Sequence, residues 1–384
     1  MILIDLIAGA RPNFIKIAPI IEALDKAKAG GSSLRYRLVH TGQHYDRTMS
    51  DSFFEQLCIP KAEINLGVGS GSQAEQTAKI MMGYEHILMK QKSVLCVVVG
   101  DVTSTMACAI TARKLCVPVA HVEGGLRSGD WTMPEEINRI VTDSISNWFF
   151  TTSAFANDNL RRCGVNEEQI FFVGNTMIDT LLKNLSKLRK PPIWHDGHLR
   201  KKEYFVVTLH RPNNVDGEKK LAALLDEIVR GARGRPLVFP VHPRTAKNLA
   251  RLDFAHDGLQ MIEPLGYLEF NYLVKYCYAV ITDSGGITEE TTVMGIPCMS
   301  LRDSTERPET ITMGTNELVG TDPTKLSPYF DRLSAGEWKK GTNPPLWDGK
   351  ASERIVGHLE KILGSQGGLK SGSSDILVGN RVKI

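Results

Sequence analysis

Four carboxylates in the first half of the chain occupy positions suited to acid–base chemistry. Asp101 directly follows the apolar run VLCVVVG, and Glu123 directly follows VPVAHV. Both runs are typical of buried β-strands, and an ionised group at the end of a buried strand is costly unless it is paired or used. Glu135 and Glu136 follow Pro134 and precede INRIVTDSI, a pattern that predicts two ordinary acids in the first turn of a helix. We expect at most one of this last pair to be catalytic.

The segment TDSGGITEETTVMG carries the clearest signal for an anionic ligand. Ser284, Gly285 and Gly286 end a predicted strand and begin a predicted helix. Backbone N–H groups at a helix N-terminus bind anions, and glycines let a ligand approach the backbone closely. Glu289 and Glu290, one turn later, could accept hydrogen bonds from ribose hydroxyls. The alternative is an ordinary strand–helix turn with a serine cap, and the local sequence does not choose between the two.

Basic residues that could hold a pyrophosphate occur in both halves of the chain. Arg11 and Lys16 flank a strand–helix turn, His210 and Arg211 end a strand, and Arg307 lies in STERPET. Each alone is typical of a surface charge, and a pyrophosphate would need several of them together.

Several familiar motifs are absent from the sequence. No GxGxxG follows a strand, and neither GxxxxGK[ST] nor GxSxG occurs. His195 and His198 form an HxxH pair, but it lies in a basic segment with no third ligand. We therefore expect neither a metal ion nor another cofactor.

Short apolar runs alternate with longer helical patterns along the chain, which predicts an α/β protein with two Rossmann-like, doubly wound domains facing a cleft. The basic, proline-containing segment 187–202 interrupts this alternation and indicates a linker or domain edge. We divide the chain into an N-terminal domain, 1–178, a C-terminal domain, 179–362, and a Gly/Ser-rich tail, 363–384. The last helix is a candidate for packing back on the N-terminal domain. A ligand is expected in the cleft, beyond the carboxyl ends of the strands.

The predicted strands are MILIDLIAG, LRYRLVHTG, VLCVVVGD, VPVAHVEG, WFFTT and IFFVGN in the first domain, and YFVVTLH, LVFPVHP, LQMIEP, YAVITDSGG and PCMSLRD in the second.

Composition excludes several classes of protein. A chain of 384 residues suits two domains, and its net charge of +3 implies neither a nucleic acid nor a membrane surface as partner. The seven cysteines form no CxxC pair, which predicts reduced, buried thiols in a cytoplasmic protein. The N-terminus lacks a basic region and has Asp5 inside its apolar run, so we expect no signal peptide.

The sequence resembles the non-hydrolysing UDP-N-acetylglucosamine 2-epimerases from the first strand to about Ile362. The resemblance rests on GARPNFIKIAPI, HTGQHYD, GDVTST, HVEGGLRSGD, MPEEINR, VGNTMIDTL, TLHRPNNVD, FPVHPRT, DSGGITEE and LRDSTERPE. It implies the two-domain fold shared with GT-B glycosyltransferases, and interconversion of UDP-GlcNAc and UDP-ManNAc. It also implies a UDP-sugar as the ligand and a homodimer as the assembly.

Carried over residue by residue, the resemblance places catalytic carboxylates on Asp101, Glu123 and Glu135, and a catalytic or phosphate-binding histidine on His210. The implied UDP contacts are Arg11, Lys16, Phe270, Ser284, Gly285, Gly286, Glu290 and Arg307, with the uracil near Phe270. Bacterial members often hold a second, activating UDP-GlcNAc, and part of that site is matched by Gln43 and His242. The arginine of that site has no counterpart in the 67–77 loop. Many members have Thr at position 10 and Glu at position 13, where this chain has Ala10 and Asn13.

The chemistry of the sugar sets requirements of its own. The hydrogen at C2 of a pyranose has no adjacent carbonyl group, so a base cannot simply remove it. Expulsion of UDP from C1 builds positive charge on the ring, and loss of the C2 proton then leaves a 2-acetamidoglucal. UDP adds back after reprotonation on the other face. This route needs an anion cradle for UDP, carboxylates beside the sugar and a cleft that excludes water.

Other functions stay open at this point. They are a hydrolysing epimerase, an epimerase of a modified UDP-sugar such as a 2,3-diacetamido-glucuronate, a GT-B glycosyltransferase and a non-catalytic nucleotide-sugar sensor. The glucuronate would need an additional cation near C6, and the intact set of carboxylates disfavours the sensor.

Overall fold

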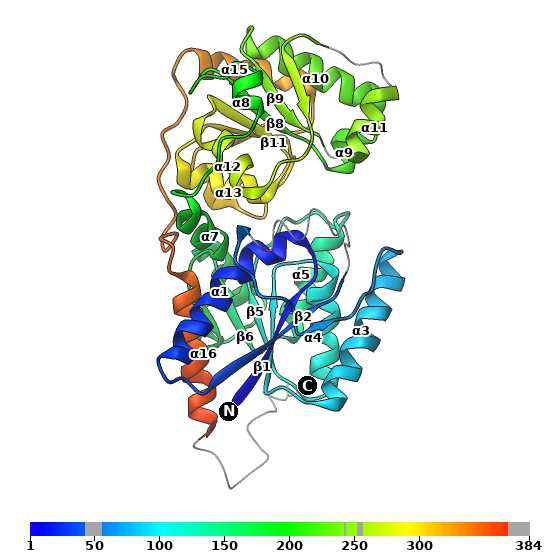
Figure 1. The fold of residues 1–384 in the computed structure, drawn as a ribbon, viewed down its shortest axis with the longest axis vertical. Helices are drawn as coiled ribbons and strands as arrows, with labels where there is room; N and C mark the ends of the chain where they lie inside the picture. The colour runs from blue at the N-terminus through cyan, green and yellow to red at the C-terminus, as the bar shows by residue number, and fades with distance from the viewer. Residues whose placement is uncertain (43–55, 242, 252–255, 368–384) are drawn as a thin grey trace.

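Two parallel β-sheets organise the protein, one in each of two lobes stacked along its long axis (Figure 1). The computed structural model describes residues 1–42, 56–241, 243–251 and 256–367. The predicted α/β architecture with two doubly wound sheets is confirmed.

The N-terminal sheet has seven strands in the order β3-β2-β1-β4-β5-β6-β7, with parallel pairing throughout. Its central strand, LCVVV, is buried along its whole length, as expected for a parallel strand covered by helices on both faces. The strands are β1 (Ile2–Ala8), β2 (Leu34–His40), β3 (Ile64–Asn65), β4 (Leu95–Val99), β5 (Val119–Val122), β6 (Trp148–Thr151) and β7 (Ile170–Phe172).

The C-terminal sheet has six strands in the order β10-β9-β8-β11-β12-β13, also parallel. The strands are β8 (Phe205–Thr208), β9 (Leu237–Pro240), β10 (Leu259–Ile262), β11 (Ala279–Thr282), β12 (Cys298–Ser300) and β13 (Asn316–Leu318). The sequence analysis did not predict the edge strands β3 and β13. They have two and three residues, too few for an apolar pattern to mark them.

The helices connect the strands and cover the sheets (Figure 1). Those of the first lobe are α1 (Arg11–Ala29), α3 (Gln73–Lys90), α4 (Thr103–Lys114), α5 (Pro134–Ile145), α6 (Ala154–Arg162) and α7 (Thr176–Asn184). Those that follow are α8 (Ile193–Asp196), α9 (Pro212–Val215), α10 (Glu218–Ala232), α11 (Pro243–Arg251), α12 (Tyr267–Tyr276), α13 (Gly285–Met294), α14 (Pro308–Thr312), α15 (Ser327–Ser334) and α16 (Ala351–Gly367). Two 3₁₀ turns are Glu167–Gln169 and Pro323–Lys325.

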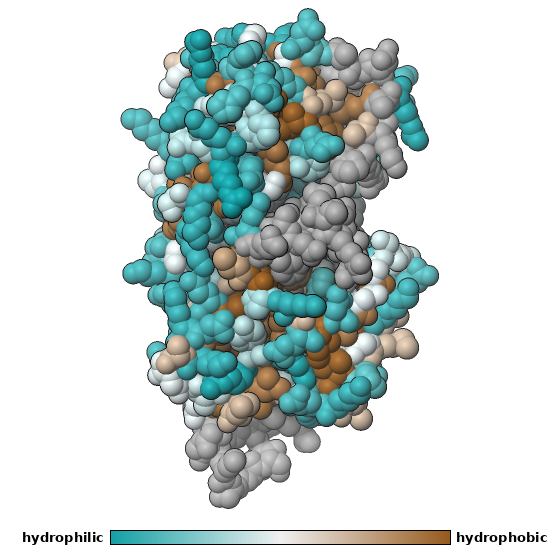
Figure 2. Space-filling view, viewed as in Figure 1, coloured by the Kyte–Doolittle hydropathy of each residue, from teal (hydrophilic) through white to brown (hydrophobic). Residues whose placement is uncertain are grey.

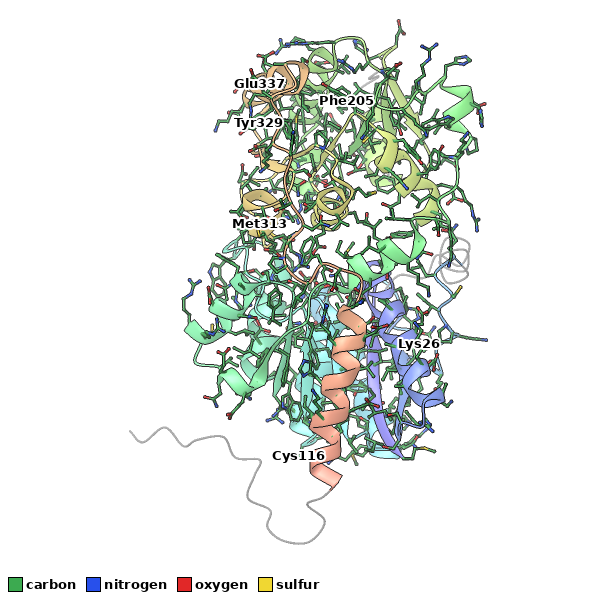
Figure 3. All side chains as sticks on the ribbon, turned by 90° about the vertical axis from the view of Figure 1, so that its left-hand side faces the viewer. Lys26, Cys116, Phe205, Met313, Tyr329 and Glu337 are labelled. Atoms are coloured by element: carbon green, nitrogen blue, oxygen red, sulfur yellow. The ribbon has the colours of Figure 1, made fainter. Side chains whose placement is uncertain are left out.

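The last helix crosses back to the first lobe. After α15 the chain runs down the side of the molecule, and α16 lies beside α1 (Figures 1 and 3). Ile355, Leu359 and Leu363 belong to the same buried core as Ile4 and Leu6 of strand β1. The chain therefore crosses between the lobes twice, and α16 completes the hydrophobic core of the N-terminal lobe.

The segments that connect the lobes pack against the body of the protein. The expected boundary between residues 178 and 179 falls inside α7, whose Thr180 hydroxyl donates to the carbonyl oxygen of Ile15 in α1 at 2.6 Å. The segment 187–202 forms the short helix α8, and Trp194 in that helix contacts the rings of Tyr204 and Tyr272 edge-on. This segment thus packs on the C-terminal lobe.

The cysteines are all free, but they are not all buried. Cys96, Cys108, Cys277 and Cys298 are buried, as predicted. The prediction is wrong for Cys58, Cys116 and Cys163, which are exposed (Cys116 is labelled in Figure 3). Cys116 and Cys163 follow the last residues of α4 and α6, where apolar neighbours do not imply burial. No helix within the described ranges is both long and apolar enough to cross a membrane. Most of the Gly/Ser-rich tail, from residue 368 onward, lies outside the described residues.

The packing of α16 predicts a stability effect that is confined to its buried face. Leu359→Ala should lower the free energy of unfolding by about 2–5 kcal/mol, because Leu359 is fully buried and the substitution leaves a cavity. The neighbouring Glu360 is exposed, and Glu360→Ala should change it by less than about 0.5 kcal/mol. Chemical denaturation of both variants measures the difference. Equal effects would show that α16 does not depend on this contact.

Candidate active site

The carboxyl ends of the two sheets face a cavity of about 780 Å³ between the lobes. The space-filling view shows a mainly hydrophilic face whose outline is notched between the lobes (Figure 2). Most residues singled out from the sequence line this cavity: Lys16, Asp101, Glu135, His210, Phe270, Ser284, Gly285, Gly286, Glu290 and Arg307. The side chain of Arg11, and Gln43 and His242 altogether, lie outside the described residues.

Asp101 is held at the cavity by an arginine that the sequence analysis did not identify. It follows β4 after Gly100, whose φ of +70° is one that glycine adopts without strain. Its Oδ2 accepts from Nη1 of Arg139 at 2.5 Å, and its backbone oxygen accepts from Nδ2 of Asn138 at 2.8 Å. Arg139 and Asn138 both lie on α5. This helix therefore orients Asp101 while the carboxylate still lines the cavity.

The structure separates the two glutamates that begin α5. Glu136 is buried and accepts from the backbone N–H groups of Ser128 and Gly129 at 2.9 and 3.1 Å, and from Arg139 Nη2 at 2.6 Å. Burial alone would raise the pKa of Glu136, but these donors outweigh it and lower the pKa. Glu135, one residue earlier, is half-buried and lines the cavity. Glu136 therefore fixes the 128–129 loop, and Glu135 is the one available to a ligand.

Glu123 lies behind the cavity lining, in an uncommon backbone conformation. Its φ is +69°, a left-handed value that few non-glycine residues adopt. Its Oε2 accepts from Lys16 Nζ at 2.8 Å and from Arg307 Nη2 at 2.6 Å, while its Oε1 is buried with no hydrogen-bond partner among the described residues. Burial would raise the pKa of Glu123, but the two cations lower it. Lys16 and Arg307, which do line the cavity, stand between this carboxylate and a ligand.

A buried histidine ties together the turns that carry Asp101 and Glu123. His121, in β5, places Nε2 2.8 Å from the carbonyl oxygen of Gly100 and Nδ1 2.7 Å from Oδ1 of Asp143. The other oxygen of Asp143 accepts from the backbone N–H of Gly125 at 3.0 Å. Because a carbonyl oxygen can only accept, Nε2 carries a proton. No sequence pattern marks Asp143 as a partner of His121, which lies 22 residues away in the chain.

Arg307 connects the two lobes through carboxylates on both sides. Its Nε lies 2.6 Å from Oε1 of Glu289 on α13, and its Nη2 reaches Glu123 on the other lobe. Oε1 of Glu289 also accepts from Nδ2 of Asn175, just before α7, at 2.7 Å. Burial would lower the pKa of Lys16, but Glu123, Asp101 and Glu289 together outweigh it and raise the pKa. The result is a buried cluster of two cations and two carboxylates beside the cavity.

The first turn of α13 supplies close backbone access to the cavity. A Cβ on Gly285 would lie 2.6 Å from Oε1 of Glu306, and one on Gly286 would lie 2.9 Å from Cε of Met177. A side chain at either position would therefore have to displace the end of a neighbouring side chain. The N–H groups of this turn face the cavity with the partial positive charge of the helix end, which suits a phosphate.

Glu290 lies on the side of α13 that faces α12. Its Oε1 accepts from the hydroxyl of Tyr267 at 2.9 Å and from Nδ2 of Asn271 at 3.4 Å. Burial raises the pKa of Glu290 to about 7. Phe270, on α12, lines the cavity nearby and offers an apolar ring for a base.

His210 follows β8 and is held by an aspartate that begins the DSGG motif. Its Nδ1 lies 2.7 Å from Oδ1 of Asp283, which leaves Nε2 for a ligand. Asp283 also accepts from the backbone N–H of Arg211 at 2.9 Å and from Nδ2 of Asn214 at 3.1 Å. Burial would raise the pKa of Asp283, but His210 and the donors of Arg211 and Asn214 together outweigh it and lower the pKa.

Known proteins resemble this chain over nearly its whole length. A family model described as UDP-N-acetylglucosamine 2-epimerase matches residues 26–360. A relative named UDP-N-acetylglucosamine 2-epimerase, from Methanocaldococcus jannaschii, is 40% identical, and the match covers 92% of this chain and 97% of the relative. A Pseudomonas aeruginosa relative named UDP-2,3-diacetamido-2,3-dideoxy-D-glucuronate 2-epimerase is 37% identical, with 93% and 99% covered.

The crystal structure of the M. jannaschii UDP-GlcNAc 2-epimerase, in complex with UDP-GlcNAc and UDP, superposes with a TM-score of 0.85 at 40% identity. The superposed region covers 94% of this chain and all of the M. jannaschii chain. Because the family model and these relatives span both lobes and the cavity between them, the chain belongs to the UDP-N-acetylglucosamine 2-epimerase family.

Proposed function

We propose that this protein interconverts UDP-GlcNAc and UDP-ManNAc by elimination and re-addition of UDP, through a 2-acetamidoglucal. One observation carries the proposal. The carboxylates Asp101 and Glu135 line the same cavity as the cations Lys16 and Arg307 and the glycine turn of α13. Acid–base groups and an anion cradle thus meet in one space between the lobes.

The cradle is proposed to hold the diphosphate throughout the reaction. Lys16, Arg307 and the N–H groups of Gly285 and Gly286 are its positive groups, and Nε2 of His210 is a further contact. When the C1–O bond breaks, the electron pair leaves with UDP, and these groups stabilise the added negative charge. Glu290 is proposed to accept from the ribose hydroxyls, with the uracil against Phe270.

The sugar is proposed to lie toward α5 and the end of β4. A carboxylate there removes the C2 proton as UDP departs, and C1 and C2 become doubly bonded. A second carboxylate returns a proton to the opposite face of C2, and the diphosphate then attacks C1 again. Asp101 and Glu135 lie at the cavity for these steps, and Glu123, with one unpaired oxygen, is the third candidate.

A modified sugar is a second candidate substrate, and one observation favours it. Arg211 lines the cavity, and the contacts of its guanidinium within the described chain are the carbonyl oxygen of Asp283 at 2.9 Å and the sulfur of Met133 at 3.4 Å. Such a cation could bind the carboxylate of a 2,3-diacetamido-glucuronate, the sugar named for the P. aeruginosa relative.

The resemblance also implies a homodimer and a cytoplasmic location, and both are part of the proposal.

Solvent exchange distinguishes these functions directly. Incubation of the protein with UDP-GlcNAc in D2O should place deuterium at C2 and produce a manno signal in the NMR spectrum, because C2 is deprotonated and reprotonated in each cycle. Stoichiometric free UDP with free ManNAc would indicate a hydrolysing enzyme instead. No exchange without an acceptor would indicate a glycosyltransferase, and exchange only with the diacetamido-glucuronate would select the modified substrate.

Substitution of single carboxylates tests their proposed roles. Asp101→Asn, Glu123→Gln and Glu135→Gln should each lower kcat by at least about 100-fold, because each removes an acid–base group, while UDP binding persists. Kinetics and UDP titration measure the two effects separately. Near-normal turnover would remove that residue from the mechanism.

The adjacent glutamates of α5 provide a matched pair for the same experiment. Glu136→Gln should lower the free energy of unfolding by on the order of 3 kcal/mol, because it leaves Arg139 buried with one anionic partner fewer. Glu135→Gln should leave stability within about 0.5 kcal/mol of the unaltered protein, since Glu135 is half-buried and lines the cavity. The reverse order in chemical denaturation would exchange the roles of the two residues.

A further inference from the structure

The buried cluster at the junction of the lobes balances its own charge before any ligand binds. Lys16 and Arg307 are 10% and 5% exposed at their side chains, and Glu123 and Glu289 are both 1% exposed. The two cations and two carboxylates sum to zero when all four are ionised. Buried charges are tolerated only when they are paired in this way.

A diphosphate that binds Lys16 and Arg307 disturbs this balance. The diphosphate of a UDP-sugar is a dianion, and it would enter a space where both cations already have carboxylate partners. With all four side chains still ionised, two carboxylates and a dianion would share two cations away from bulk water. Like charges at such distances repel strongly in a low-dielectric site. One carboxylate must therefore move away from its cation or lose its charge.

The contacts select Glu289 as the carboxylate that gives way. Glu123 is held by two cations through one oxygen, at 2.8 and 2.6 Å, whereas Glu289 has one cation, Arg307, and the neutral amide of Asn175. Glu289 also lines the cavity, one turn from the glycines that begin α13, whereas Glu123 lies behind the cations. A diphosphate at this turn meets Glu289 first.

The charged groups around Glu289 come from several elements. Lys16 lies on α1, Glu123 follows β5 and Arg307 precedes α14, while Asn175, just before α7, contributes a neutral amide. On its own helix, Glu290 turns toward Tyr267 instead. Burial raises the pKa of Glu289, and Arg307 offsets that rise only in part. Glu123, by contrast, has a lowered pKa.

We propose that a bound diphosphate replaces Glu289 as the partner of Arg307, and that Glu289 takes up one proton from solvent as this occurs. The only bond formed is between that proton and a carboxylate oxygen of Glu289. The neutral side chain then no longer repels the leaving UDP, whose negative charge increases when the C1–O bond breaks. This inference rests on the proposed function, because it takes the diphosphate of UDP as the ligand of the cluster.

Titration calorimetry with UDP in buffers of different ionisation enthalpy tests the inference. At about pH 8 the terminal phosphate of UDP is already ionised. The number of protons taken up per bound UDP should therefore be larger for the unaltered protein than for Glu289→Gln, by up to about one. The affinity of the unaltered protein for UDP should fall by about tenfold per pH unit above the range where free Glu289 ionises. Glu289→Gln carries no titrating group at this position, so its affinity should change far less with pH.

Glu309→Gln is the matched control. It removes another buried carboxyl group, in the first turn of α14, that does not line the cavity. Its difference in proton uptake from Glu289→Gln should therefore match that of the unaltered protein. Equal uptake in the unaltered protein and in Glu289→Gln would overturn the inference, as would UDP binding without pH dependence. A protein that does not bind UDP would overturn the proposed function itself.

A second variant keeps the test decisive if Glu289→Gln does not fold. Asn175→Ser removes the amide donor to Glu289 but keeps an oxygen that can cap α7, as Asn175 does at 2.9 Å from the N–H of Met177. Loss of that donor makes the carboxylate harder to ionise. The fall in UDP affinity should therefore move to higher pH, and an unchanged profile would exclude Glu289 as the titrating group.

Discussion

Arg307 is shared by a carboxylate from each lobe, and this shared guanidinium joins the lobes beside the cavity. Glu123 belongs to the N-terminal lobe and Glu289 to the C-terminal lobe, and both are almost fully buried. Neither carboxylate could be buried without a cation, because transfer of an unpaired charge from water costs several kcal/mol. The positions of the lobes are therefore coupled to the pairing of four side chains at their junction.

The carboxylates beside the cavity owe their positions to groups that a substrate would not touch. His121 and Asp143 join the turns after β4 and β5, and Arg139 joins Asp101 to Glu136. These bonds are formed by residues distant in sequence and are buried, so each turn is fixed by the other. An elimination that needs bases on defined faces of a sugar needs this rigidity, because small displacements of a catalytic group slow a reaction sharply.

The sequence predicted the inner strands and their carboxyl ends correctly because local pattern decides them. Apolar runs of four to seven residues marked the central strands, and polar residues at their ends marked the cavity. The same reasoning missed β3 and β13, which are too short to carry a pattern. It also could not choose between Glu135 and Glu136, because both satisfy the preferences of a first helical turn. They are distinguished only by the way α5 is turned relative to the 128–129 loop, because this rotation directs Glu136 to the N–H groups of the loop.

The sequence by itself determined the α/β class, the two sheets and the set of polar strand ends, since these follow from periodicity and residue type over short distances. The motifs, taken together, were also enough to indicate the family. The tertiary structure alone decided which charges meet. Lys16 and Glu123 are 107 residues apart, and Glu123 and Arg307 are 184 apart. The first pair is made by packing within the N-terminal lobe and the second by contact between the lobes, and no local pattern in the chain encodes the distance between the partners.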